Sequence, residues 1–267
     1  MVHFDASRAS HHRLRLAADL AMRLQAALIG IAGRPYLPSF LADDIAVAAD
    51  DSDAEQRELT ALLADIGTKF RAEAERIKHV EWRGAVDDVN RLVAREARAA
   101  DLVVVGRPAD SADLYYSLDP GVTILRCGRP VLLVPDGVDV LASRRVVVAW
   151  KDSREARRAV QDALPLLQQA HESTIVEICE YGTEAQSQRR LEDVANYLRR
   201  QKVGVRATAC LHTQRPVAQE IIRVARDEKA DLIVAGGYGR SRLGEWMFGG
   251  VTRGLLAESP LCCLFSH

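Results

Sequence analysis

The sequence lacks the features that would place a protein in a membrane or on a nucleic acid. No stretch of about eighteen apolar residues occurs among its 267 residues, so we expect no membrane-spanning helix. The formal net charge is -1 and no long basic run is present, which argues against a nucleic acid as the main partner. The N-terminal residues have no apolar segment behind a basic start, so we expect no signal peptide.

Cysteine pairs with metal-site or redox-site spacing are also missing. The five cysteines form an odd set with no C-x-x-C pair. Three of them, Cys179, Cys262 and Cys263, fall in or beside apolar runs, where a thiol packs as a small hydrophobic group. We therefore expect reduced thiols and a cytoplasmic protein. The composition, 48% apolar and 27% charged, is that of an ordinary globular chain, long enough for about two domains.

Several motifs of catalytic sites are absent or incomplete. No P-loop of the form G-x4-G-K-[S/T] occurs. The glycines at 236–239 do not make a dinucleotide-binding fingerprint, because Arg242 stands where the third glycine belongs. A nucleophile elbow begins at Gly239 and fails at Leu243, where glycine is required. The adjacent His11 and His12 point about 100° apart on a helix and make a poor metal chelate.

The chain repeats itself. Residues 100–106 match residues 230–236 at an offset of 130 (236 − 106), while residues 5–8 match residues 151–154 at an offset of 146 (151 − 5). The difference, 146 − 130 = 16, places about sixteen extra residues in the first half, and we assign them to the polar stretch at 34–53. The repeat indicates two similar units in tandem. We expect domains at 1–138 and 144–267, with 136–143 as the linker.

Strands and helices alternate in the second repeat. Strand patterns fall at 145–150, 174–179, 203–211, 231–235 and 261–265, and helical patterns fall at 153–169, 184–201, 216–228 and 252–258. Ser153 is the expected N-cap of the first of these helices. The first repeat follows the same plan, with its opening strand clipped by the start of the chain. The alternation predicts an α/β fold of two open parallel sheets, each with helices on both faces.

A glycine-spaced loop is the strongest functional signal. The expected strand 231–235 leads into Gly236 and Gly239, and Gly249 then precedes the helix that begins near Thr252. Glycine lets a backbone approach a phosphate closely, and the unpaired N–H groups at a helix start attract anions. In open sheets, ligands bind beyond the carboxyl ends of the strands. The loop therefore predicts an anion site, with a ligand-free tight turn and helix cap as the alternative.

These residues resemble the universal stress protein family, in particular its tandem members with two domains in one chain. The family motif G-x2-G-x9-G-[S/T] runs here through Gly236, Gly239 and Gly249, with Gly250 in the place of Ser or Thr. Residues 148–156 also resemble the opening strand, turn and helix of the family, and the resemblance covers the chain twice. It implies five parallel strands in each domain, an adenine nucleotide alpha hydrolase-like fold, and pairing of the domains through their last strands.

The resemblance further implies that the second domain binds ATP or AMP. Mg²⁺ is a candidate cofactor, and a second copy of the chain is a candidate partner in a homodimer. No obvious general base lies near the expected phosphates, so we expect no fast catalysis. The residues implied at the nucleotide are Ala149, Trp150, Lys151, Ser153, Cys179, Gly236, Gly239, Arg240, Gly249, Gly250, Val251 and Thr252.

The chain departs from the family pattern in both halves. Lys151 replaces an acidic residue near the adenosine, and Gly250 removes a hydroxyl whose hydrogen bond to a phosphate is worth about 1.5–3 kcal/mol. In the first half, the residues that align in sequence with Gly239, Gly249 and Gly250 are Ala109, Asp119 and Pro120. A carboxylate repels phosphate and a proline lacks an N–H donor. We therefore expect one nucleotide per chain, in the second domain.

Three other functions stay open at this point. The protein could be an interaction scaffold that binds no nucleotide, as in the glycine-poor branch of the family. It could also hydrolyse ATP slowly or phosphorylate itself. An adenylating or pyrophosphatase enzyme on a related fold is a further alternative, although residues 151–154 do not supply the Ser-Gly-Gly type of loop that such enzymes need.

Overall fold

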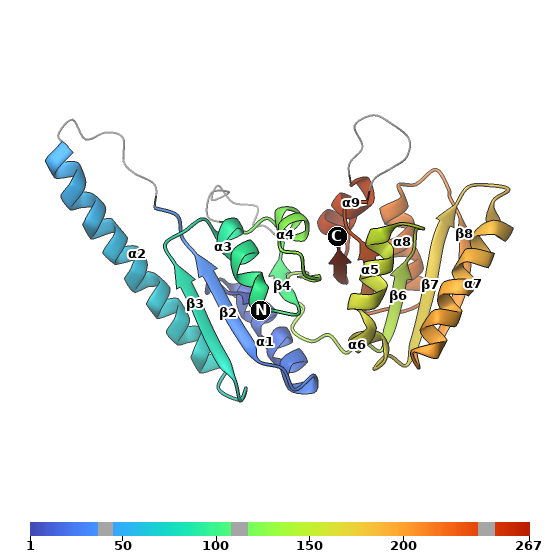
Figure 1. The fold of residues 1–267 in the computed structure, drawn as a ribbon, viewed down its shortest axis with the longest axis horizontal. Helices are drawn as coiled ribbons and strands as arrows, with labels where there is room; N and C mark the ends of the chain where they lie inside the picture. The colour runs from blue at the N-terminus through green and yellow to red at the C-terminus, as the bar shows by residue number, and fades with distance from the viewer. Residues whose placement is uncertain (37–44, 108–116, 240–248) are drawn as a thin grey trace. The chain divides into compact units, whose positions relative to one another are not determined.

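A computed structural model describes residues 1–36, 45–107, 117–239 and 249–267, with the backbone alone for 45–52. The described chain forms two compact units, each built on a sheet with flanking helices (Figure 1). Unit 1 comprises Met1–Thr123 and Asp136–Val140, and unit 2 comprises Ile124–Pro135 and Leu141–His267.

Unit 1 contains four strands in the order β3-β2-β1-β4, and the pairs β3–β2, β2–β1 and β1–β4 are parallel. Its elements are β1 (Val2–His3), α1 (Arg8–Arg23), β2 (Leu28–Gly33), α2 (Ile45–Glu73), β3 (Val80–Ala85), α3 (Val89–Glu96), a 3-10 turn (Ala97–Ala99) and β4 (Val103–Gly106). Helix α4 (Pro120–Arg126) continues the chain from unit 1 into unit 2. The two-residue β1 agrees with the clipped strand expected from the sequence.

Helices cover both faces of the unit 1 sheet. A Cβ atom at Gly30 of β2 would lie 2.6 Å from the Phe70 ring of α2, whereas one at Gly33 would lie 2.9 Å from Val89 of α3. Residues three apart on a strand point to opposite faces. Helices α2 and α3 therefore lie on opposite faces, as right-handed crossovers in this strand order require.

Unit 2 contains six strands in the order β5-β10-β9-β6-β7-β8. All neighbouring pairs are parallel except β5–β10, which is antiparallel. Its elements are β5 (Val131–Val134), β6 (Arg145–Ala149), α5 (Arg154–Asp162), α6 (Leu164–Leu167), β7 (Glu172–Cys179), α7 (Glu184–Arg200), β8 (Val205–Leu211), α8 (Val217–Asp227), β9 (Leu232–Gly236), α9 (Gly250–Glu258) and β10 (Cys262–Ser266).

Strand β5 ends the first repeat in sequence, yet it lies in unit 2 beside β10, the last strand of the second repeat. The register pairs Leu133 with Cys263 and Leu132 with Leu264, and all four side chains are buried. This is the pairing of last strands that the family resemblance implies. The domain limits 1–138 and 144–267 follow the repeat and remain a prediction, because the compact units divide the chain differently around β5.

The helix predicted at 153–169 is wrong as one continuous helix. It divides into α5, which ends at Asp162, and the short α6, which begins at Leu164. Pro165 lies in the first turn of α6. Proline has no N–H to donate to the carbonyl one turn earlier, so it starts a helix more readily than it continues one.

Much of the extra length of the first repeat is helical. Helix α2 has 29 residues and α7, its counterpart in the second repeat, has 17. Helix α2 begins at Ile45, inside the stretch to which we assigned the insertion, and residues 37–44 lie outside the described residues. Within the described chain, none of the helices combines the length and the apolar character needed to cross a membrane.

Helices α8 and α9 approach closely at a glycine, which gives a test of the packing in unit 2. A Cβ atom at Gly254 would lie 2.5 Å from the Ala218 Cβ atom. Alanine normally stabilises a helix interior by about 0.5–1 kcal/mol over glycine, but overpacking costs about 1–3 kcal/mol. We expect Gly254→Ala to lower the free energy of unfolding by about 1 kcal/mol, measured by urea denaturation.

The double variant Gly254→Ala/Ala218→Gly should be more stable than the summed effects of the two single substitutions predict. We expect this difference in the free energy of unfolding to be at least about 0.5 kcal/mol. Gly204 is a matched control, because the nearest atom to a Cβ atom there is the His171 carbonyl oxygen at 3.8 Å. Gly204→Ala should therefore leave stability unchanged or higher. Additive effects of the Gly254 and Ala218 changes would contradict the contact.

Candidate functional site

The carboxyl ends of β6 and β9 bring the two predicted loops of unit 2 together. A Cβ atom at Gly236, the last residue of β9, would lie 2.7 Å from the backbone nitrogen of Ala156 in the first turn of α5. Only glycine lets α5 begin this close to β9. As a result, a Cβ atom at Gly239 would lie 3.1 Å from the Glu155 Oε2 atom and 3.7 Å from the Ser153 Oγ atom.

Helix α9 begins at a glycine in the left-handed conformation. Gly249, its N-cap, has φ 82° and offers no side-chain cap. The Tyr238 ring lies over this glycine, since a Cβ atom at Gly249 would lie 2.5 Å from the ring. The Tyr238 N–H donates to the Thr252 Oγ1 atom at 3.0 Å. Among the described residues, no side chain caps the first-turn N–H groups of α9, where an anion would be stabilised.

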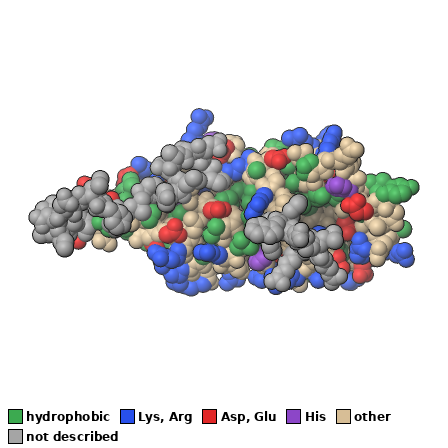
Figure 2. Space-filling view, turned by 90° about the horizontal axis from the view of Figure 1, so that it is seen from above, with side chains coloured by type: hydrophobic (Ala, Val, Ile, Leu, Met, Phe, Trp, Pro, Cys, Tyr) green, Lys and Arg blue, Asp and Glu red, His purple; other side chains and the backbone are tan. Residues whose placement is uncertain are grey.

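The predicted Ser153 cap of α5 is confirmed. Ser153 Oγ accepts a hydrogen bond from the Ala156 N–H at 3.3 Å. Lys151 is exposed, and the exposed Asp152 forms an ion pair with Arg157. This loop therefore presents charges of both signs next to residues 236–239, which we call the glycine turn. In the view onto the strand ends, basic and acidic side chains are likewise interspersed on the described surface (Figure 2).

Glu155 is a site residue that sequence reasoning missed. Its side chain is buried, with 5% of the residue exposed, and it pairs with Arg154 at 2.6 Å. Burial raises the pKa of Glu155, but hydrogen bonds from Arg154, the backbone and Ser153 outweigh burial and hold that pKa below its usual range. An ionised carboxylate thus faces Gly239. Its place in the first turn of α5 was the only sequence signal.

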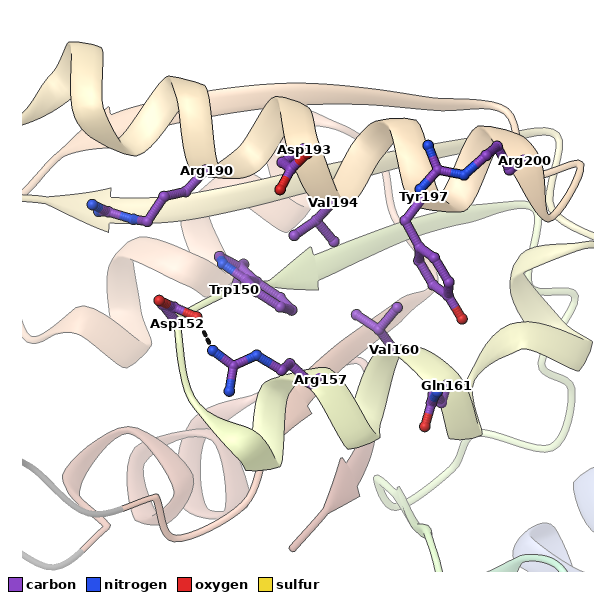
Figure 3. Close-up of a pocket in the computed structure, with 10 residues that line it drawn as sticks. All are labelled: Trp150, Asp152, Arg157, Val160, Gln161, Arg190, Asp193, Val194, Tyr197 and Arg200. Atoms are coloured by element: carbon purple, nitrogen blue, oxygen red, sulfur yellow. Dashed lines mark hydrogen bonds and ion pairs between the residues drawn. The ribbon is translucent and has the colours of Figure 1, made fainter.

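The remaining predicted site residues are spread over the strand ends. Ala149 is half-buried at the end of β6, and Cys179 is buried at the end of β7, where its carbonyl accepts from the His212 N–H at 2.7 Å. Gly250 and Val251 form the first turn of α9. Arg240 lies outside the described residues. The Trp150 side chain does not face the glycine turn but lines a cavity between α5 and α7 (Figure 3).

The sequence profile of the Universal stress protein family matches residues 1–113 and 142–265, which is most of the chain and covers both repeats. The chain belongs to the universal stress protein family. It is a tandem member, with two family domains in one chain. No curated protein matches the sequence.

Solved structures agree on the fold. A universal stress protein from Archaeoglobus fulgidus DSM 4304 matches with a TM-score of 0.68 and 18% identity, over 99% of this chain and 95% of that one. A functionally unknown protein from Pseudomonas aeruginosa PAO1 matches with a TM-score of 0.55 and 15% identity, over 92% of this chain and 84% of that one. At these identities the similarity shows the shared fold alone.

In the first universal stress domain, the helix start that corresponds to α9 is closed by a carboxylate. Asp119 Oδ1 accepts hydrogen bonds from the Gly121 N–H at 2.7 Å and from the Val122 N–H at 3.2 Å. The Asp119 N–H itself donates to the Asn90 Oδ1 atom at 2.8 Å. The first turn of α4 therefore already holds an anion from its own chain. Ala109, the other departure noted above, lies outside the described residues.

A buried arginine occupies the strand ends of the first domain. Arg13 is 4% exposed, and its Nε–H donates to the His3 carbonyl at 2.8 Å. A Cβ atom at Gly106, at the end of β4, would lie 2.0 Å from the Arg13 guanidinium. A second guanidinium nitrogen lies 3.3 Å from His3 Nδ1. Because a guanidinium can only donate, Nδ1 accepts and the His3 ring is neutral.

Across the described residues, no group of three or more His, Cys, Asp or Glu side chains could hold a metal ion.

The buried His3 predicts that the first domain loses stability as the pH falls. Burial first, and then the Arg13 charge, lower the His3 pKa from its ordinary 6.5 to about 4. Between these values the unfolded chain binds a proton that the folded chain does not, so stability falls as pH falls from about 6.5 to about 4. We expect a loss of roughly 3 kcal/mol across this window, measured by urea denaturation at several pH values.

His3→Asn is the matched variant, because its side-chain oxygen can replace Nδ1 as an acceptor and does not titrate. The variant should lose most of the pH dependence between pH 6.5 and 4 while remaining folded at pH 7. An unchanged pH dependence in His3→Asn would assign the acid sensitivity to other groups.

Proposed function

We propose that the second domain binds an adenine nucleotide, ATP or AMP, and that the protein is a nucleotide-responsive stress or regulatory protein without fast catalysis. The observation that carries this proposal is the contrast between the two helix starts. Helix α9 begins at Gly249 without a side-chain cap, whereas Asp119 caps the corresponding helix α4. A phosphate at α9 would take the place that Asp119 fills in the first domain, so we expect one nucleotide per chain.

The charges around the glycine turn bear on the affinity. Lys151 and Arg253 are exposed near the two ends of the proposed phosphate site and would attract the nucleotide. Glu155 opposes it, because its ionised carboxylate faces Gly239. Of the described side chains at the turn, Glu155 is the nearest candidate for a general base, but its lowered pKa makes it a weak one. This favours binding over turnover, with slow hydrolysis or self-phosphorylation as the catalytic alternative.

A cytoplasmic location and a homodimer complete the proposal. Four of the five cysteines are buried, where a free thiol packs as a small hydrophobic group, and this supports a compartment that keeps thiols reduced. Native mass spectrometry of the purified protein reads the oligomeric state and any co-purifying nucleotide in one measurement.

Gly239→Val tests the nucleotide site. Residue 239 needs no positive φ, and a side chain there would project toward Glu155 and Ser153, into the space proposed for phosphate. A ligand at about 100 times its Kd stabilises the native state by about 2.7 kcal/mol. We expect ATP with Mg²⁺ to raise the melting temperature of the wild type but not of Gly239→Val. Gly204→Val, at an open position, should keep the response.

Two outcomes count against the proposal in different ways. A full ATP response in Gly239→Val would place the nucleotide elsewhere. No response in the wild type at millimolar ATP would favour the interaction scaffold, for which the buried Glu155 beside the turn is the supporting observation.

Glu155→Gln tests how the carboxylate affects affinity. A unit charge about 6 Å from a phosphate oxygen contributes roughly 1–3 kcal/mol of repulsion. Removing it also releases Arg154 from its ion pair. We expect ATP to bind about tenfold more tightly to Glu155→Gln, and AMP, with fewer charges, to gain less, as measured by titration calorimetry.

Glu180→Gln is the control, because Glu180 has an exposed side chain at 82% and follows β7 rather than the glycine turn. It should leave both affinities unchanged. Weaker ATP binding in Glu155→Gln would show that the carboxylate supports the site instead of opposing it.

A further inference from the structure

Ile124, in the last turn of α4, packs directly against the glycine turn. A Cβ atom at Gly237 would lie 2.6 Å from the Ile124 Cγ2 atom, well inside the usual contact distance of about 3.5–4.0 Å between carbon atoms. Ile124 is 2% exposed. Both residues belong to unit 2, yet Ile124 comes from the helix before β5, the last strand of the first repeat. The first repeat thus supplies a side chain to the candidate site of the second.

The glycine turn lies between two helices. A Cβ atom at Gly236 would meet the Ala156 nitrogen at the start of α5, whereas one at Gly237 would meet Ile124. Neither glycine has the positive φ that often explains a glycine. The missing side chains therefore serve close approach, and α5 limits the turn on one side while α4 limits it on the other.

The end of the chain holds the backbone of Gly237. Its N–H donates to the Ser266 carbonyl at 2.8 Å, and its own carbonyl oxygen lies 3.0 Å from the His267 Nδ1 atom. Because a carbonyl oxygen only accepts, Nδ1 carries the proton in this contact. With both backbone groups engaged, the remaining constraint on residue 237 is the packing of Ile124 against its Cα atom.

Tyr238 connects this packing to the start of α9. Its φ of 53° is left-handed, which is uncommon for a residue other than glycine. Its N–H donates to Thr252 Oγ1 at 3.0 Å, and its ring lies over Gly249. Space opened at Ile124 allows Gly237 to move, and a movement there displaces the contacts that Tyr238 makes with α9.

We propose that Ile124 positions the glycine turn and thereby sets the nucleotide affinity of the second domain. The first repeat then takes part in nucleotide binding without holding a nucleotide itself. Ile124 contacts the turn and not the ligand, so it is a positioning residue. The inference rests on the proposed function for its ligand, whereas the packing of α4 on the turn is independent of any ligand.

Ile124→Leu tests the contact with little change in volume. Leucine lacks the Cγ2 branch that faces Gly237, and volume-conserving substitutions are the best tolerated in a core. We expect ATP with Mg²⁺ to bind Ile124→Leu about fivefold more weakly than the wild type, by titration calorimetry, because packed side chains transmit effects of this size. Ile124→Val keeps Cγ2 and should weaken binding less. Unchanged affinity in Ile124→Leu would overturn the proposal.

Leu125→Ala is the matched control. Leu125 follows Ile124 on α4 and is 46% exposed, so its truncation removes apolar surface from the same helix without touching the turn. ATP affinity should stay at the wild-type value in this variant.

An exchange of volume between the two positions separates positioning from core stability. Gly237→Ala adds a Cβ atom where Ile124 leaves no room, and it should weaken ATP binding about tenfold. Ile124→Ala provides that room. The double variant should therefore bind ATP at least about threefold more tightly than Gly237→Ala alone. Gly237→Ala/Leu125→Ala should show no such rescue. Equal or weaker binding in the double variant with Ile124→Ala would show that Ile124 acts only through stability.

Amide hydrogen exchange, measured by NMR, reports the turn without a ligand. The Gly237 and Tyr238 N–H groups are hydrogen-bonded, and looser packing makes such groups exchange faster. We expect both amides to exchange at least about fivefold faster in Ile124→Leu, and at the wild-type rate in Leu125→Ala. Wild-type exchange rates in Ile124→Leu would overturn the positioning of the turn. If ATP does not bind the wild type and exchange accelerates as expected, the proposed function fails and the positioning of the turn by Ile124 stands.

Discussion

The start of α5 lies against the end of β9, and this contact leaves no room for a side chain at residue 236. A Cβ atom there would lie 2.7 Å from the Ala156 nitrogen. The rest of the candidate site depends on this approach. It sets Ser153 and Glu155 beside Gly239. Parallel strands bring both loops to one edge of the sheet, but the missing side chain decides how close they come.

The two repeats differ in how the N–H groups at the start of a helix are supplied with an acceptor. Each ends a strand at a glycine and starts a helix whose N–H groups need an acceptor. In the first repeat the chain supplies the acceptor, Asp119, and Arg13 fills the strand ends. In the described part of the second repeat no side chain caps α9, and the carboxylate beside Gly239, Glu155, is turned to Arg154 and Ser153. An anion at the start of α9 would be stabilised by the helix dipole.

Sequence reasoning predicted correctly those features that are determined by residues close together in the chain. The Ser153 cap, the strand ranges, the tandem repeat and the clipped β1 all depend on residue type and spacing over short distances. It failed at Pro165, whose missing N–H splits a helix that apolar spacing alone made continuous. Glu155 and Arg13 were missed for another reason. Both are charged residues on helices, a type that is normally solvated, and only the packing of each helix on strand ends buries them.

Trp150 shows how the same reasoning could be extended. The sequence places it at the end of β6, next to a predicted phosphate loop, and that position suggests a contact with a nucleotide base. However, side chains alternate along a strand, so residue 150 shares a face with residues 146 and 148. Those two valines are buried under the helices of the sheet face. Alternation therefore directs the indole under α5 and α7 rather than over the sheet edge. In that buried position its N–H has no partner among the described residues. The end of β6 therefore contributes to two neighbouring places. Its backbone leads into the loop beside the glycine turn, and the Trp150 side chain lines a separate cavity on the face of the sheet.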